Sequence, residues 1–258
     1  MLKIKKYFRL NVILIFLFSI FVGFANAENI LSETIEITAD KNMEWDQSEN
    51  KILAYGGAYV KSNNFLLKAD KITGFYEGNI GEGNIKSLNA DINANFTSEN
   101  TTIKAEQINY DFIEDLVKVK GNNIFMTFKE GSINADKNLT FNNREQKILV
   151  YGNVKIKIKT KGDIKAQTVL INTDTTGNIL NLNASKDVEI FLKKFKQNVI
   201  ADEAKFDIQN SEISFLGNVI LRQGKSFLKG DKAFIDLKNG ISKISSYEKN
   251  TVSGFFKK

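Results

Sequence analysis

The amino-acid sequence lacks three residue types entirely: cysteine, histidine and proline. Without cysteine there is no disulfide and no thiolate nucleophile, so an exported protein of this composition must gain its stability from sheets and core. Without histidine, Ser-His-Asp and Cys-His catalysis and the usual zinc sites are excluded. The lack of proline favours long uninterrupted strands, because proline removes a hydrogen-bond donor from a strand ladder.

Carboxylates do not supply an alternative catalytic arrangement. Acid–base hydrolysis needs paired carboxylates in a cleft, and the sequence offers only the loose pairs Asp46 with Glu49 and Glu99 with Glu106. Turn or surface positions explain both pairs more simply. No Asp-rich glycine turn of the kind that binds calcium recurs. We therefore predict a protein that is not an enzyme and that uses no metal or cofactor.

Residues 1–27 have the three parts of a secretory signal peptide. A basic start precedes an apolar run from Leu10 to Phe24, and the small-residue site Ala25-Asn26-Ala27 follows. A retained membrane anchor is the alternative, but the run is shorter than the roughly 20 residues that span a bilayer. We predict cleavage after Ala27. Removing the four basic residues of this segment leaves little of the net charge of +6, so we expect no nucleic-acid partner.

One short motif recurs along the rest of the chain: an apolar residue, any residue, Ala or Gly, then an acidic residue. Seven copies occur, and the acidic position fails once, at Gln167. The copies begin at Ile37, Leu67, Ile103, Ile133, Ile164, Val199 and Leu228. The apolar and small residues are two apart and share one face of a strand, whereas the acidic residue points outward to solvent or to a neighbouring lysine.

A second motif is a strand that crosses a glycine, at Gly56, Gly121, Gly152 and Gly217. The positions two and four residues before and after each glycine are apolar, with Asn123 as the exception. This period-two pattern predicts a strand with one buried face. The glycine predicts a bulge or bend where the sheet turns a corner.

The motifs repeat at a longer interval of about 96 residues, as Ala39 and Ala135 or Gly121 and Gly217 illustrate. We predict a tandem duplication, with a first unit at 28–134 and a second unit at 135–258 that continues the same β stack. Many short strands with inward aliphatic residues predict an all-β sandwich, jellyroll or solenoid. From the residues alone the interior is either a dry, filled core or an open apolar groove.

The stretches Ile37–Tyr76 and Ile103–Ile148 resemble the organic-solvent-tolerance (OstA-like) N-terminal domain, the family of LptA, LptC and the N-terminal domain of LptD. The Gly-Asn strand, the Ala-Asp-Lys strand start and their spacing carry this resemblance, although Gly57-Ala58 replaces the Asn in the first repeat. The resemblance implies an open, twisted β-jellyroll of antiparallel strands. It also implies a periplasmic protein that carries lipopolysaccharide between the membranes, with the acyl chains of lipid A in an inner groove.

The resemblance further implies partners and a set of groove residues. LptC-like and LptD-like jellyroll domains would add to edge strands near 34–39 and 235–244, and head-to-tail self-association is possible by the same contact. Alternatives are a structural or adhesive β-stack with a filled core and a membrane-anchored LptC-like component. Lys155, Lys157 and Lys159 could meet lipid phosphates, although a solvated strand face explains them more simply. The predicted groove residues are Ile37, Val60, Leu67, Ile103, Val119, Phe125, Ile133, Val154, Ile156, Ile164, Val199, Phe215, Leu221 and Leu228.

Overall fold

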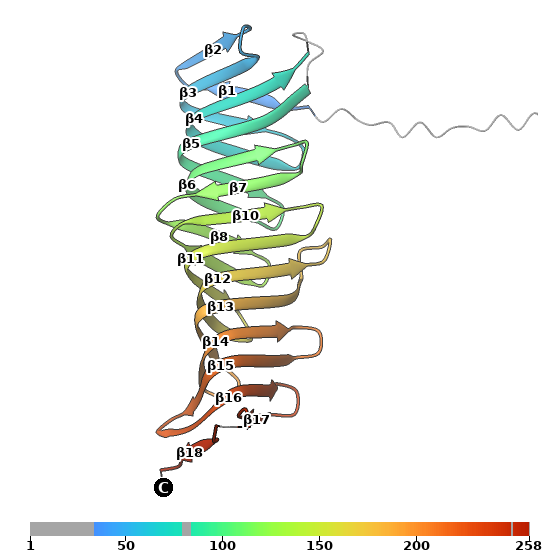
Figure 1. Cartoon of the computed structure of the whole chain (residues 1–258). Helices are drawn as coiled ribbons and strands as arrows, with labels where there is room; N and C mark the ends of the chain where they lie inside the picture. The colour runs from blue at the N-terminus through green and yellow to red at the C-terminus, as the bar shows by residue number, and fades with distance from the viewer. Residues whose placement is uncertain (1–33, 79–83, 249, 258) are drawn as a thin grey trace, which may run out of the picture. The chain divides into compact units, whose positions relative to one another are not determined.

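The computed structural model describes residues 34–78, 84–248 and 250–257, and within them all regular structure is β (Figure 1). The predicted signal peptide lies outside the described residues. Residues 34–258 form one compact unit. The strands are β1 (Glu36–Ala39), β2 (Asn42–Asp46), β3 (Lys51–Lys61), β4 (Phe65–Glu77), β5 (Asn84–Ser98), β6 (Thr102–Asp111), β7 (Leu116–Lys120), β8 (Ile124–Phe128), β9 (Gly131–Ala135), β10 (Asn138–Asn142), β11 (Lys147–Ile158), β12 (Gly162–Thr173), β13 (Ile179–Leu192), β14 (Gln197–Asp207), β15 (Glu212–Gln223), β16 (Ser226–Asp236), β17 (Ile241–Ser245) and β18 (Ser253–Phe255).

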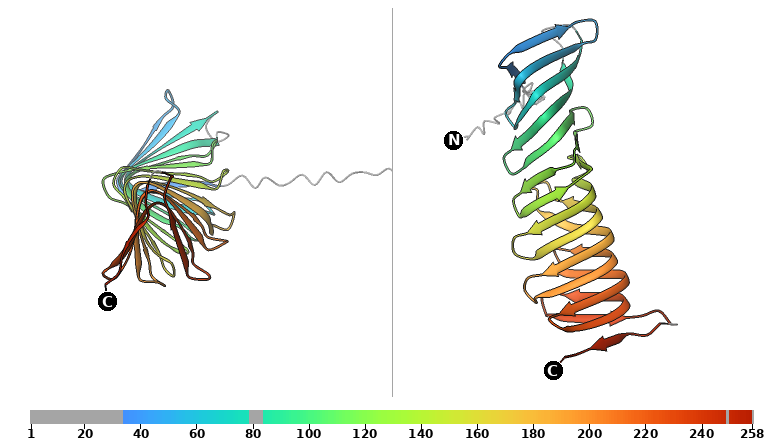
Figure 2. Two further views of the ribbon diagram at one scale, coloured as in Figure 1. Left: turned by 60° about the horizontal axis from the view of Figure 1, so that its bottom comes forward. Right: turned by 90° about the vertical axis from the view of Figure 1, so that its left-hand side faces the viewer.

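Each strand pairs antiparallel with strands close to it in the sequence, so the chain stacks upon itself from β1 to β18 (Figures 1 and 2). The prediction of an all-β jellyroll of antiparallel strands is confirmed. Pairing runs without a break through β9 to β11, around the predicted unit boundary at residue 134. The two-unit division therefore stays a prediction about the sequence.

The long strands bend at one corner and so belong to two walls that diverge from it (Figure 2). The first wall contains β2, β7, β10 and β17 with one half of each long strand, and the second contains β1, β8, β9 and β18 with the other half. The ladder shifts register at the bend, for example between Tyr151 and Val154 in β11. These shifts are β-bulges, as the strand glycines predict.

Two consecutive residues with positive φ form each of several bulges, among them Gly152-Asn153 and Gly217-Asn218. The acidic residue of the first motif lies against this bulge on the neighbouring strand. Asn218 Nδ2 donates a hydrogen bond to the Asp202 carboxylate at 2.8 Å, and Asn153 donates to Asp136 in the same way. The acidic residue therefore braces the corner through an asparagine, where the sequence predicted solvent or a lysine.

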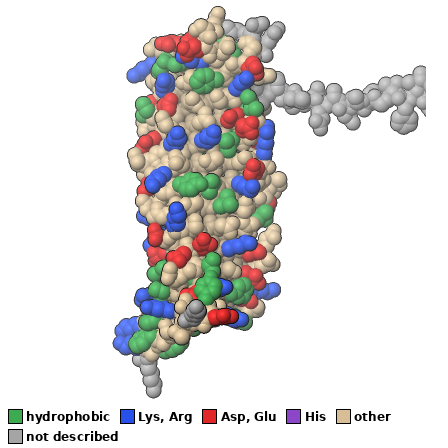
Figure 3. Space-filling view, in the orientation of Figure 1, with side chains coloured by type: hydrophobic (Ala, Val, Ile, Leu, Met, Phe, Trp, Pro, Cys, Tyr) green, Lys and Arg blue, Asp and Glu red, His purple; other side chains and the backbone are tan. Residues whose placement is uncertain are grey.

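The inner faces of the two walls meet in one apolar cluster that extends through the described stack. Alternation along the strands builds it, as in β11, where every second residue from Ile148 to Ile158 is buried. Each fully buried Val, Leu or Ile contributes about 1.5–3 kcal/mol of transfer free energy. The outer face in Figure 3 carries interspersed charges of both signs, and its hydrophobic side chains are mostly scattered.

Within the described residues, β1 and β2 pair only with β3, and β17 and β18 pair only with β16. The predicted N-terminal edge therefore agrees with β1. The predicted C-terminal edge at 235–244 is only half right, because Ile235 lies in β16, which has a strand on each side. Within the described residues no strand lies beyond β2, and Trp45 of this strand is 49% exposed.

Candidate functional site between the two walls

Most of the predicted groove residues are buried in the packed interior. Eleven of the fourteen are at most 5% exposed. They come from both walls and pack against one another, so protein side chains fill the interior along most of the described stack. These residues are Val60, Leu67, Ile103, Val119, Ile133, Val154, Ile156, Ile164, Val199, Phe215 and Leu221.

The placement of Phe125 on the inner face is wrong. In β8 the buried residues are Ile124 and Met126, and Phe125 lies between them on the outer face, opposite Lys104 and Asn134. The cause is one additional residue, Asn123, between Gly121 and the strand that follows it. One extra residue exchanges the two faces of a strand, because the side-chain period is two.

The remaining predicted site residues lie at the ends or outside the interior. Ile37 in β1 and Leu228 in β16 are half-buried. Lys155 and Lys157 are exposed on the outer face of the second wall, and only Lys159 lies in a turn at the free margin of that wall.

The interior opens at a mouth on the side away from the corner. We call the turns of the first wall at this margin the first lip and those of the second wall the second lip. Between them lies a cleft of about 1010 Å³. Its floor is apolar, and it consists of Met126, Phe128, Ile148, Ile171 and Ile179, while Asn, Thr, Ser and Gln side chains surround it.

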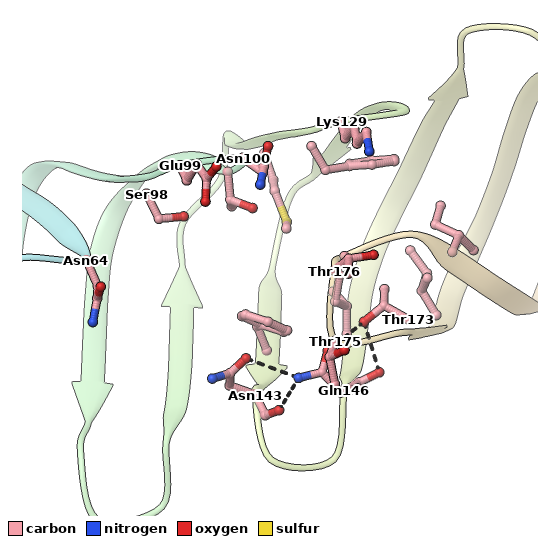
Figure 4. Close-up of a pocket in the computed structure, with 18 of the residues that line it drawn as sticks. Asn64, Ser98, Glu99, Asn100, Lys129, Asn143, Gln146, Thr173, Thr175 and Thr176 are labelled. Carbon is pink, nitrogen blue, oxygen red and sulfur yellow. Dashed lines mark hydrogen bonds between the residues drawn. The ribbon is translucent and has the colours of Figure 1, made fainter.

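Figure 4 shows Ser98, Asn100 and Lys129 on the side of the second lip and Gln146 and Thr173 on the side of the first. Within the first lip Thr173 binds Gln146 twice, with its amide nitrogen 2.9 Å and its hydroxyl oxygen 3.3 Å from the Gln146 carbonyl oxygen. No hydrogen bond within the described residues joins the two lips across this cleft.

Toward the N-terminal end, four aromatic residues close the mouth, and we call them the aromatic clasp. Phe65 and Phe96 of the second wall stack with ring centroids 5.5 Å apart. Tyr110 and Phe112 of the first wall are in contact at 4.4 Å. The Phe65 ring meets the Tyr110 ring edge-on at 5.4 Å, which joins the two walls. Aromatic pairs of this kind add about 0.5–1.5 kcal/mol to the free energy of burial.

Toward the C-terminal end, residues of the turn after β13 cross the mouth. Lys194 Nζ donates a hydrogen bond to the Leu237 carbonyl oxygen of the first lip at 2.8 Å. Phe195 lies over Gly240 of the same lip. The Lys161 ammonium lies 5.6 Å from the centre of the Phe206 ring. The mouth is therefore closed on both sides of the cleft.

Aspartates occupy the first lip and bind their own turns. Hydrogen bonds from the Asn178 and Thr176 side chains, and from their amides, lower the pKa of Asp174 to about 2. Backbone and side-chain hydrogen bonds from Asn210 lower the pKa of Asp207, and those from Asn239 lower the pKa of Asp236. These carboxylates stay ionised at neutral pH and serve as turn acceptors.

Sequence reasoning missed the residues that shape the mouth. The cleft floor contains Met126, Ile171 and Ile179, which stand on inner strand positions, so the period-two pattern could have identified them. The same pattern places Phe65 on an inner strand position, but it does not predict the contact of Phe65 with Tyr110, which is 45 positions away in the chain. Among the residues that the structure describes there is no metal-binding group of three or more acidic, Cys or His side chains, and no helix long and apolar enough to cross a membrane.

Comparison with known proteins gives the family. The profile described as LptA/(LptD N-terminal domain) LPS transport protein matches residues 36–147 and 198–257. The chain belongs to this family. The LptA family is one of periplasmic transport proteins and not of enzymes, so the protein has a role in lipopolysaccharide transport and the prediction of no catalysis is confirmed. Residues 148–197, which the profile leaves out, form β11 to β13 of the same ladder.

No curated protein matches the chain. Among solved structures, one similar chain is LptH, the LptA homologous periplasmic component of the lipopolysaccharide transport device of Pseudomonas aeruginosa. It is 11% identical, with a TM-score of 0.44, over 49% of this chain and 94% of LptH. This similarity is too low to support an argument about function.

Proposed function

We propose that the protein carries lipopolysaccharide across the periplasm, to which cleavage after Ala27 delivers it, with the acyl chains of lipid A held between the two walls. The observation that supports this proposal is a continuous apolar interior that opens to solvent at one cleft. The cleft volume of about 1010 Å³ is at the upper end of the roughly 300–1,000 Å³ typical of small-molecule pockets. Each acyl methylene that leaves water there gains about 0.8 kcal/mol.

The acyl chains enter at the cleft floor, where Met126 and Phe128 line the opening. Deeper residues such as Ile133 and Ile156 are fully covered by protein. Further entry therefore requires the walls to move apart. The corner acts as the hinge, and the separation begins at the cleft, where the apolar interior already meets solvent.

A photo-crosslinking experiment tests this proposal with a matched control in one strand. A benzophenone amino acid replaces Phe128, which lines the cleft, or Phe125, which lies on the outer face of β8. In cells we expect an adduct with lipopolysaccharide from position 128 and none from position 125. Equal yields from the two positions, or no adduct from position 128, would contradict a lipid-holding interior.

The filled interior favours a second candidate, a structural β-stack without lipid cargo. Eleven covered aliphatic and aromatic positions are what such a stack requires. This candidate predicts no adduct at either position, together with normal lipopolysaccharide delivery after depletion of the protein.

We also propose that partners bind by strand addition at the terminal strands. Glu44 of β2 and Lys243 of β17 lie on strands that have a neighbour on one side only within the described residues. Such edges template further strands, so LptC-like and LptD-like jellyrolls or a second copy can extend the stack. The natural chain has no cysteine. Cysteines introduced together at Glu44 and Lys243 should therefore give disulfide-linked head-to-tail oligomers, and a strictly monomeric product would argue against self-addition.

A further inference from the structure

The second lip is lysine-rich over three successive turns, between β8 and β9, β11 and β12, and β13 and β14. These turns contain six lysines and one acidic residue, Glu130. We call the six lysines the lysine lip. They are Lys129, Lys159, Lys161, Lys193, Lys194 and Lys196.

Hydrogen bonds hold the three turns side by side. Lys159 Nζ donates to the Lys129 carbonyl oxygen at 3.1 Å, and Lys193 Nζ donates to the Lys159 carbonyl oxygen at 3.2 Å. The backbone also joins two of these turns: the Lys193 amide donates a hydrogen bond to the Lys161 carbonyl oxygen at 3.1 Å. Successive turns are two strands apart, which is about 9.5 Å. The three lysine-bearing turns thus form a continuous row along the mouth.

This row has no carboxylate partner in the described part of the chain. The five ion pairs found there involve Lys51, Lys86, Lys147 and Lys165 instead. The facing aspartates of the first lip are engaged by their own turns, as the hydrogen bonds to Asp207 show. At physiological ionic strength the screening length is about 8 Å. Successive turns are slightly farther apart than this length, so the positive potential at each turn comes mainly from the lysines of that turn, and it favours an anion.

The lysine lip borders the cleft. Lys129 is one of the residues that line the cleft, next to Phe128 of the apolar floor. A lipid whose acyl chains enter over that floor leaves its head group at this margin. Each lysine that donates to a backbone carbonyl keeps two further N–H donors, and lysine is a common point-charge ligand for phosphate.

We propose that the lysine lip binds the phosphate groups of the lipid head while the acyl chains lie between the walls. This inference rests on the proposed lipid-carrying function and adds a phosphate site to it. The spacing of the turns lets successive lysines receive a head group as it moves along the mouth. The uncharged second-lip turn at 62–64 and the turn at 98–101, which contains Glu99, offer no such contact at the N-terminal end.

The test measures lipid A binding by the full mature chain and by two triple variants that lose the same charge. The lip variant combines Lys129→Gln, Lys159→Gln and Lys193→Gln. The control variant combines Lys104→Gln, Lys155→Gln and Lys157→Gln on the outer face of the second wall. For bisphosphorylated lipid A we expect the lip variant to bind roughly 10- to 100-fold more weakly, as for the loss of three charge-assisted hydrogen bonds. The control should change less than twofold.

Three further measurements distinguish the possible outcomes of this test. Dephosphorylated lipid A should bind the natural chain and the lip variant equally, and Lys→Arg at the three lip positions should retain affinity for the phosphorylated form. Equal losses in lip and control variants, or equal affinity of the natural chain for both lipids, would overturn the phosphate site alone. Failure of the natural chain to bind either lipid would overturn the lipid-carrying function as well. Inorganic pyrophosphate that binds as tightly as the lipid would overturn the lipid head as the source of the phosphate.

Discussion

The N-terminal and C-terminal parts of the mouth are closed in different ways. The N-terminal part is closed by the aromatic clasp, in which Phe65 and Tyr110 bring the walls into apolar contact. The C-terminal part is bridged by Lys194 and Phe195 and carries the lysine lip. The strands beneath the two parts follow a similar alternation, which in β4 and in β12 shifts by one residue at the bulge, and in β4 Thr73 is buried in addition.

The interior and the mouth of the stack are under different structural constraints. Inner strand positions must fill the space between the walls, so they stay aliphatic or aromatic at both ends. The lysines at one end are turn residues that face solvent and do not share that constraint, whereas the aromatic closure at the other end comes mainly from strand residues at the margin of the walls, Phe65, Phe96 and Tyr110. The two ends of the mouth therefore differ in the chemistry of the side chains that close them.

The largest effect is expected when the aromatic clasp is removed. Phe65→Ala takes a 7% exposed ring out of contact with three other rings, and buried Phe→Ala changes typically lower the free energy of unfolding by about 3–5 kcal/mol. Phe195→Ala, at the half-buried C-terminal bridge, should cost about 1 kcal/mol. Urea denaturation of both variants measures this, and equal losses would show that the two closures are energetically alike.

Two substitutions at the corners should change the stability by smaller amounts and in opposite directions. Gly217 has a φ of +78°, and a Cβ there would collide with the Asp202 carboxylate, so Gly217→Ala should lower stability by about 1–3 kcal/mol. Ile92, at the corner of β5, is a β-branched, 60% exposed residue with a φ of +65°. Ile92→Gly should therefore raise stability by about 1 kcal/mol. Thermal denaturation of both variants measures the two changes. If Gly217→Ala raised the stability, the inferred strain at this corner would be wrong.

The smallest effect concerns acidification, which acts on the first lip through Asp174. The ordinary pKa of Asp174 is 3.8, and the hydrogen bonds from Asn178 and Thr176 lower it to about 2. The ionised carboxylate stabilises its turn above pH 4, and this contribution is lost as the pH falls through about 2. Carbon NMR should find the Asp174 midpoint near 2, moving toward 3.8 in Asn178→Ala, and an unshifted midpoint in the natural chain would rule out the turn bonds.

Much of the fold and part of the site could be predicted from local patterns. Period-two apolarity predicted strands with one buried face, and eleven predicted residues are indeed buried. The prediction for Phe125 was wrong because Asn123 changes which residues of β8 face inward. A pattern counted from Gly121 takes no account of such an inserted residue. The exposure of Trp45 has no signal in the sequence, because burial at the end of a stack depends on the next strand and not on residue type.

The sequence by itself determined the all-β class, the inward face of most strands, the corner glycines and the absence of His- or Cys-based chemistry. These follow from alternation and composition, which act over a few residues. Only the tertiary structure decided that the interior is filled, that Asp202 braces the corner through Asn218, and that the mouth is closed by rings at one end and edged with lysine at the other. Those features join residues that are far apart in the chain, so they depend on how the walls twist and meet.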